Sequence, residues 1–139
     1  MSDKEKELDL FLLGKKYNKA FKFEEAIKYL TKAIRLNNQV SEYFNERGAS
    51  HFRIFQYEEA IDDFTKAINI KEEHHYFANR ASCFTSQKKW GEVIKDYSKA
   101  IEINKNELAK NREYTIELGT AYKEIGQSEN ALNLYREFL

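Results

Sequence analysis

Proline is absent from this chain of 139 residues, and glycine occurs only five times. So few turn-forming residues leave little room for long loops or flexible linkers. The longest apolar run is Leu10 to Leu13, which is too short for a signal peptide or a membrane-spanning helix. Cysteine occurs once, at Cys83, so no disulfide can form within the chain. These absences favour a single domain in a reducing compartment, which we take to be the cytoplasm.

Residues suited to catalysis or metal binding are scarce as well. The histidines are His51, His74 and His75, and two neighbours on a helix point about 100° apart, so His74 and His75 do not face one ion. We interpret His51 as a packing residue and Cys83 as a small buried hydrophobe. No glycine-rich phosphate loop is present. The sequence therefore predicts no catalytic residue, no metal site and no cofactor.

Neither sign of charge is in excess, because 23 Lys and Arg residues balance 23 Asp and Glu residues. Nucleic-acid binding needs a net basic surface, so we expect no nucleic-acid partner, and we expect no membrane partner either. The charges lie in blocks that alternate in sign: residues 14–35 are basic, 41–73 acidic and 74–106 basic. The first block either attracts an acidic partner or solvates an outer helix face.

The chain does contain a short sequence motif that occurs four times. A small residue followed by isoleucine or leucine recurs at intervals of 34, 33 and 38 residues, at Ala26, Ala60, Val93 and Ala131. Twelve positions before each of them stands another small residue: Gly14, Gly48, Ala81 and Gly119. Intervals in the thirties are typical of stacked repeats. Because the spacing of twelve is constant, the differences between the intervals arise in the connections between repeats, and each repeat unit is intact.

Each repeat is predicted to be a pair of amphipathic helices. Apolar residues recur at steps of three and four on both sides of short connections such as 21–23 and 55–57. Connections this short force the two helices of a pair to pack antiparallel. Small residues such as Gly14 are expected where two helix backbones approach closely. No segment has the pattern of a strand.

The phrase Leu13-Gly14-x-x-Tyr17, followed by Ala26 and Ala33 on the next helix, resembles the tetratricopeptide repeat. The resemblance covers residues 7–139. It implies an all-α fold, a right-handed α-solenoid of antiparallel helix pairs with four repeats and about eight helices in one domain, 1–139. The repeats are expected at residues 7–40, 41–73, 74–106 and 107–139. The proline usual near the end of each repeat is missing, so looser turns are expected there.

The resemblance also implies a function, because the first helices of such repeats line a concave groove that holds a peptide or a neighbouring protein. Cations there can hold a carboxylate or phosphate, asparagines can bond a peptide backbone, and phenylalanines can anchor apolar groups. The predicted groove residues are Phe11, Lys15, Lys19, Asn45, Phe52, Arg53, Asn79 and Ser82. An alternative role for Phe11 and Phe52 is to cover neighbouring helices. The expected function is a non-catalytic adaptor or co-chaperone-like scaffold.

One specific role within the family fits poorly. Some co-chaperones with these repeats clamp the C-terminal carboxylate of heat-shock chaperones with Lys, Asn and Arg side chains. Aligned through the glycines, this chain has Phe11 and Lys15 where Lys and Asn are expected, and Glu46 where the next Asn is expected. Glu46 would repel a carboxylate. The sequence therefore disfavours chaperone-tail binding and leaves a co-chaperone-like role through other contacts open.

Two features near the C-terminus lead to further expectations. Asn106 is a good N-cap, so the seventh helix is expected to begin about one turn early and to be longer than the others. The last helix carries apolar residues with nothing after them to cover them: Leu132, Tyr135, Phe138 and Leu139. Terminal repeats need a polar cap. We therefore expect either a fragment of a longer protein or self-association through this face, which is the alternative, architectural function.

Overall fold

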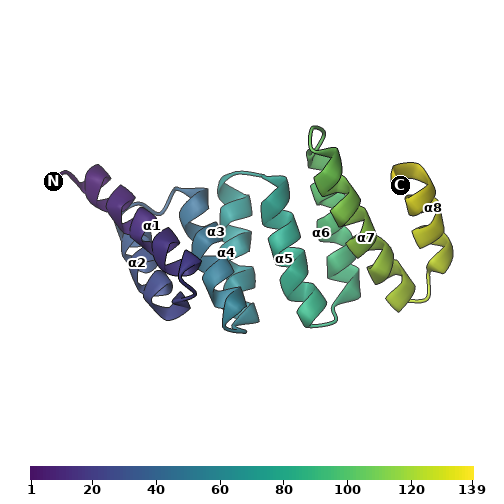
Figure 1. Cartoon of the computed structure of the whole chain (residues 1–139), viewed down its shortest axis with the longest axis horizontal. Coiled ribbons are helices and arrows are strands. Elements are labelled where there is room, and N and C mark those ends of the chain that lie inside the picture. Colours follow the sequence, from purple (N-terminus) through teal and green to yellow (C-terminus); the bar gives the residue numbers. More distant parts are fainter. The chain divides into compact units, whose positions relative to one another are not determined.

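A computed structural model describes all 139 residues and consists of eight α-helices with no strand. In chain order the helices are α1 (Asp3–Lys19), α2 (Phe23–Leu36), α3 (Ser41–Arg53), α4 (Tyr57–Ile70), α5 (His74–Ser86), α6 (Trp90–Ile103), α7 (Leu108–Glu124) and α8 (Ser128–Phe138) (Figure 1). The prediction of an all-α fold with about eight helices is confirmed. No helix is both long enough and apolar enough to cross a membrane.

The helices form two compact units. Unit 1, Met1–Glu72, holds α1 to α4, and unit 2, Glu73–Leu139, holds α5 to α8. Within each unit every helix packs against the one that follows it, and α1 also touches α3. Figure 1 shows that the two helices of each pair run in opposite directions, as their short connections require. Each unit is thus two antiparallel helix pairs.

The alanines of the repeated motif lie at the centre of each helix pair. All those on the second helices are completely buried: Ala26, Ala33, Ala60, Ala67, Ala100 and Ala131. A larger side chain at these positions would hold the packed helices apart. Phe138 occupies the equivalent position in the last helix and is 38% exposed, so α8 presents a bulky ring where the other second helices have a buried methyl group.

The small residues of the first helices have a different role from the one we expected. A Cβ placed on Gly14 would lie 2.6 Å from Cγ of Leu30, and one on Gly48 would lie 2.8 Å from the ring of Phe64. Each glycine therefore makes room for a large side chain of the second helix, rather than for close contact between the two backbones. The side chains that fill these spaces are Leu30, Phe64 and, against Gly119, Tyr135.

Every first helix ends in the same turn. In α1 the amide of Phe21 donates to the carbonyl of Asn18 at 3.0 Å, and that of Lys22 donates to the carbonyl of Tyr17 at 2.9 Å. This pair of bonds defines a Schellman motif, whose central residue is left-handed and usually glycine. The left-handed residues are Phe21 (φ 59°), Phe55 (φ 65°), Lys88 (φ 57°) and Gly126 (φ 79°). Three of the four turns therefore hold a side chain where glycine is preferred.

The start of α7 corrects the prediction made for Asn106. The N-cap position is Glu107, and the residue that organises this connection is the buried Asn104. Its side-chain oxygen accepts from the Glu107 amide at 3.3 Å, and its backbone carbonyl accepts from the Asn111 side chain at 2.7 Å. The helix has 17 residues, more than the 13 of α3 and of α5, but no more than the 17 of α1.

Candidate functional site

The first-helix face of unit 1, made by α1 and α3, carries two of the predicted cations on α1. Lys19 is exposed, and the ammonium of Lys15 lies 5.3 Å from the centre of the Phe11 ring. Neither lysine forms a salt bridge. Both charges are therefore available to an incoming carboxylate or phosphate.

A polar cluster that sequence reasoning missed joins α1 to α3 on the same face. The Asn18 amide donates to the Glu46 carboxylate at 3.2 Å, and the Ser50 hydroxyl donates to the Asn18 side-chain oxygen at 2.6 Å. Ser50 is fully buried, so the cluster closes the contact between the two helices. Glu46 is thereby held in place by an amide donor, at the position where a chaperone-tail clamp would need an amide of its own.

The phenylalanines predicted for the groove take part in packing. Phe11 is only 7% exposed, and its ring centre lies 4.8 Å from that of Tyr43 on α3. This burial leaves Phe11 little surface for a partner and favours its alternative role as a cover between helices. Phe52 is half-buried, with its ring centre 5.7 Å from that of Tyr57.

The remaining predicted residues of unit 1 lie on α3. Asn45 is half-buried in the middle of the helix. Arg53, in the last turn, is exposed, and its guanidinium carbon lies 5.4 Å and 4.9 Å from the ring centres of Phe21 and Phe23. Arg53 therefore stacks on the α1–α2 turn, at the edge of the pair, and its charge forms no salt bridge.

The first-helix face of unit 2 contains a hollow of about 270 Å³ between α5 and α7, and both predicted residues of this unit line it. The full lining is His75, Ala78, Asn79, Ser82, Tyr97, Lys110, Glu113 and Tyr114. The Ser82 hydroxyl donates to the Ala78 carbonyl at 3.1 Å, and the Lys110 ammonium lies 3.0 Å from the Glu113 carboxylate. The hollow is thus polar, and its paired charges cancel.

Buried tyrosines form the floor of this hollow. The Tyr114 hydroxyl lies 2.8 Å from Nδ1 of His74, and burial, with the charges of Glu113 and Glu107, raises the pKa of Tyr114 to about 12. Burial likewise raises the pKa of Tyr97. Both phenols therefore stay protonated at neutral pH. His74 bonds Tyr114 while His75 lines the hollow, so the adjacent histidines serve different neighbours, as their spacing on a helix predicted.

Comparisons with known proteins bear on this architecture. The family model described as "Tetratricopeptide repeat" matches residues 10–40 and 41–74, which correspond to the first two helix pairs. A comparison with curated protein sequences gives no match.

Solved structures resemble the chain over most of its length. A crystal structure of MamA protein is 23% identical, has a TM-score of 0.88, and is matched over 99% of this chain and 73% of its own. The first TPR of Spaghetti (RPAP3), bound to the HSP90 peptide SRMEEVD, is 25% identical, with a TM-score of 0.79 over 88% of this chain and 97% of its own. Residues 10–74 belong to the tetratricopeptide-repeat family, and over most of its length the chain has the fold of these solved structures.

A third solved structure extends the comparison. The Yersinia enterocolitica type III secretion chaperone SycD, in complex with a peptide of the translocator YopD, is 21% identical, with a TM-score of 0.82 over 89% of this chain and 96% of its own. This similarity shows that the two proteins share a fold. Together with the family model, these structures confirm the predicted fold class, an α-solenoid of antiparallel helix pairs.

The second and third helix pairs each contain a buried ion pair that sequence reasoning missed. Arg47 donates to both carboxylate oxygens of Asp63 at 2.8 Å, and Arg80 donates to both of Asp96 at 2.9 and 2.8 Å. The two aspartates are 2% and 4% exposed. The bond with Asp96 raises the pKa of Arg80. The available signal was an Arg–Asp spacing of 16 residues that occurs at the same place in both repeats.

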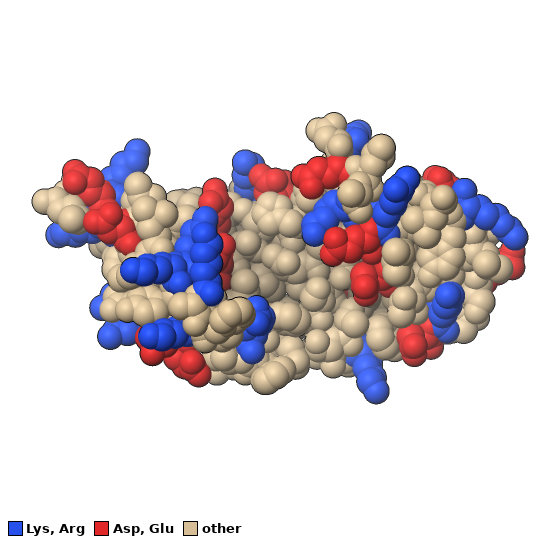
Figure 2. All heavy atoms as spheres, viewed as in Figure 1, with Lys and Arg blue, Asp and Glu red and all other residues tan.

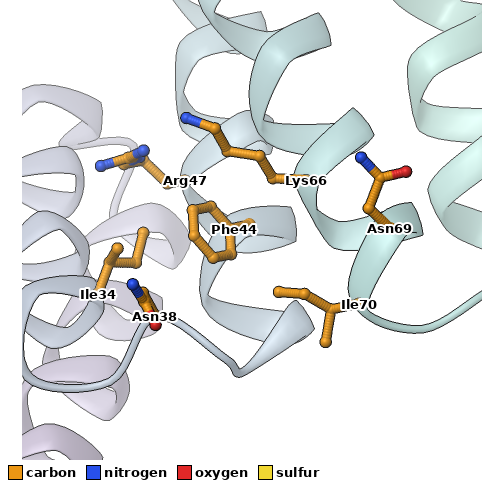
Figure 3. Close-up of a pocket in the computed structure, with 7 residues that line it drawn as sticks. All are labelled: Ile34, Asn38, Phe44, Arg47, Lys66, Asn69 and Ile70. Carbon is orange, nitrogen blue, oxygen red and sulfur yellow. The ribbon is translucent and has the colours of Figure 1, made fainter.

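On the second-helix side, unit 1 has a larger hollow, of about 440 Å³, between α2 and α4. Figure 3 shows Phe44 of α3 in the centre of the residues that line it: Ile34, Asn38, Arg47, Lys66, Asn69 and Ile70. The charged ends of Arg47 and Lys66 lie 5.8 Å and 5.9 Å from the centre of the Phe44 ring. Their charges are already paired, with Asp63 and Asp62 respectively.

The predicted self-association face on α8 is partly exposed. Leu132 is 45% exposed, Phe138 38% and Leu139 59%, whereas Tyr135 is half-buried because its ring fills the space beside Gly119. Phe138 also lines a hollow of about 230 Å³ between α6 and α8, with Ile101, Leu118 and Leu134 among its neighbours. An apolar surface therefore exists at this end of unit 2.

Proposed function

We propose that the protein is a non-catalytic interaction module that binds a peptide or partner protein on the face of its first helices, as an adaptor or scaffold. The observation that carries the proposal is the polar hollow between α5 and α7, which contains Asn79 and Ser82. Two of the similar structures described above hold peptides. The buried Cys83 forms no disulfide, which suits a reducing compartment, and we propose that the module acts in the cytoplasm.

The chemistry of this hollow suits an uncharged part of a peptide. Its only cation and its only carboxylate, Lys110 and Glu113, neutralise each other, and the rest of the lining offers amide, hydroxyl and imidazole groups. Such groups bond backbone amides and small polar side chains, which are neutral donors and acceptors. We therefore expect unit 2 to contact the peptide backbone through Asn79 and Ser82.

Unit 1 offers a separate, charged surface. Lys15 and Lys19 on α1 form no salt bridge, so a peptide carboxylate that reaches them gains a charge-assisted bond without displacing a partner. A chaperone-tail clamp is not part of the proposal. Phe11 is buried, and Glu46 stands with its carboxylate engaged by Asn18 where such a clamp needs an amide.

A peptide selection tests this proposal. Random 12-residue peptides displayed on phage are selected on the full chain, and the enriched peptides are titrated against Asn79→Ala and Lys15→Glu. Loss of one hydrogen bond or one charge contact should weaken binding about five-fold or more. Lys95→Glu on α6 is the matched control, because Lys95 is exposed on a second helix. The proposal is overturned if no enriched peptide loses affinity in either groove variant.

A second candidate function rests on the exposed apolar residues of α8. In this alternative the chain is an architectural element that self-associates through Leu132, Phe138 and Leu139. Sedimentation velocity over a concentration series, with and without Phe138→Glu, distinguishes the two. A dimer that Phe138→Glu dissociates and Lys15→Glu leaves intact supports the architectural function. A species that stays monomeric at every concentration rules it out.

A further inference from the structure

Two phenylalanines in unit 1 occupy backbone positions that favour glycine. Phe21 and Phe55 are the left-handed residues of the Schellman motifs that end α1 and α3. A side chain there crowds the following carbonyl oxygen, so glycine is the residue usually found. The equivalent positions in unit 2 hold Lys88 and Gly126. Nothing in the turn itself requires an aromatic residue.

Burial does not account for these phenylalanines either. Phe21 is 69% exposed and Phe55 is 77% exposed, the latter more than any other large hydrophobic residue of the chain. Aromatic rings normally stabilise a fold by leaving water, and these two remain largely in water. Each therefore combines an unfavourable backbone conformation with an unfavourable exposure. Burial therefore accounts for neither ring.

The two rings belong to adjoining turns, whose side chains we call the aromatic edge: Phe21, Phe23, Phe55, Tyr57 and Arg53. Phe21 meets Phe23 edge-on with ring centres 6.1 Å apart, and Phe55 meets Tyr57 in the same way at 6.3 Å. Arg53, two residues before Phe55, lies over both Phe21 and Phe23. The stacked guanidinium thus connects the turn that follows α1 with the turn that follows α3.

Unpaired positive charge adjoins the aromatic edge. Lys16, Lys19, Lys22 and Arg53 form no salt bridge. Lysines in the last turn of α1 suit the negative end of its dipole, but Lys22 is the N-cap of α2, where a cation is unfavourable. Figure 2 shows Lys and Arg atoms gathered over the α1 end of unit 1.

We propose that the aromatic edge docks an acidic peptide segment that carries an aromatic or large apolar side chain. The apolar side chain packs against Phe21 and Phe55, and the acidic residues meet Lys19, Lys22 and Arg53. The first turns of α2 and α4 contain four exposed carboxylates, Glu24, Glu25, Glu58 and Glu59. A flat anionic membrane would be repelled by them, whereas a peptide can place its acids beside the lysines alone.

The test replaces both phenylalanines by the residue that the turn prefers. Phe21→Gly with Phe55→Gly removes the rings and relieves the left-handed backbone, so the fold is retained and its thermal unfolding midpoint does not fall. Lys88→Gly in unit 2 makes the same backbone change without removing an aromatic ring and is the matched control. Peptides are selected from a random 12-residue phage library on the full chain and are titrated against each variant.

The expected peptides combine Asp or Glu with Phe, Tyr, Trp or Leu. Their dissociation constants should rise about ten-fold or more in the double glycine variant and less than about two-fold in Lys88→Gly. They should also rise with salt concentration. A selection in which no acidic peptide loses affinity in the double variant would overturn the proposal, and so would a selection that yields no peptide.

Two further arms identify other occupants. If the double variant abolishes co-sedimentation with vesicles that contain phosphatidylserine and the wild type selects no acidic peptide, the surface binds membranes and the proposal is wrong. If wild type forms a dimer in sedimentation velocity and the double variant is a monomer, the occupant is a second copy of the chain, and the proposal is again wrong. Asn79→Ala should leave edge-binding peptides unaffected, so this proposal and the proposed groove function stand or fall separately.

Discussion

The second and third helix pairs differ from the first and fourth at two positions, one on each helix. In α3–α4 and α5–α6 an arginine bonds an aspartate sixteen residues later, Arg47 with Asp63 and Arg80 with Asp96. The same positions hold Leu13 and Tyr29 in α1–α2, and Leu118 and Leu134 in α7–α8. One helix-pair geometry therefore accepts either a charged or an apolar contact.

The ion pair of the second helix pair also contacts the preceding pair. Arg47 also donates to the Thr31 hydroxyl of α2 at 3.2 Å, so it connects its own pair with the preceding one. The leucines Leu118 and Leu134 instead line the apolar hollow between α6 and α8. A buried ion pair often gives no more stability than apolar residues of similar volume, but its bonds fix one geometry. We infer that Arg47 sets the alignment of consecutive pairs in unit 1.

Breaking one ion pair should have the largest effect. Asp63→Ala leaves the guanidinium of Arg47 largely buried without its carboxylate, and an uncompensated buried charge should lower the free energy of unfolding by about 3 kcal/mol. Urea denaturation measures the change. Asp62→Ala removes the neighbouring carboxylate, which is 65% exposed, and should cost less than about 0.5 kcal/mol. Equal losses in the two variants would show that the buried pair is energetically unimportant.

The glycine that faces Phe64 offers a second way to disturb the same helix pair. The third helix pair has Ala81 where the second has Gly48, so Gly48→Ala introduces a side chain that the third pair accommodates at the equivalent position. The new methyl group would lie 2.8 Å from the rigid Phe64 ring, and overpacking of this kind should cost about 2 kcal/mol. Gly91→Ala, with nothing within 4 Å, should instead stabilise by about 0.5 kcal/mol. Thermal unfolding of both variants checks the contrast.

Replacing both members of the ion pair by leucine should have only a small effect on stability. Arg47→Leu combined with Asp63→Leu gives the second pair the leucines that the fourth has at the same positions. Because both charges leave together, the double variant should differ from wild type by less than about 1 kcal/mol, far less than Asp63→Ala alone. A double-mutant cycle in urea measures the coupling. Additive losses would mean that the two side chains act independently.

The sequence was sufficient for the fold because the information that determines it is periodic. Ala26, Ala60 and Ala131 recur in register, and each is fully buried. A small residue every thirty-odd positions can be recognised without knowing any contact, since helix packing demands it at the same point of every repeat. The glycines were located correctly for the same reason, although their packing role, beside a large side chain, emerged only from the structure.

The candidate site was less predictable because it depends on contacts between helices. Phe11 has the spacing of a groove residue, yet Tyr43 of the next pair buries it. Asn106 satisfies the local rule for an N-cap, but Asn104 takes the organising role through its bond with Asn111. Local rules do not choose between such neighbours. The ion pairs could have been predicted from their repeated spacing of sixteen residues, together with the apolar residues at that spacing in the outer pairs.

The smallest expected effect concerns a tyrosine that occurs at the same position in both units. The Tyr43 hydroxyl donates to the Glu7 carboxylate at 2.9 Å, and that of Tyr114 lies beside His74, which is Glu7's equivalent two repeats later. Burial and Glu7 raise the pKa of Tyr43 from 10.0 to about 12. Since the folded state holds this proton more tightly than the unfolded chain, the stabilisation is complete below pH 10 and is lost as the pH rises toward 12.

Tyr43→Phe tests that pH dependence. The stability difference between wild type and variant should be constant from pH 7 to about pH 9.5 and should then decrease up to pH 12, measured by urea denaturation. Titration of the lysines and of the other tyrosines is common to both proteins and cancels in the difference. Tyr114→Phe should give the same profile, because the pKa of Tyr114 is raised to a similar value. A difference that stays constant to pH 12 would mean that the Glu7 contact does not hold the phenol proton.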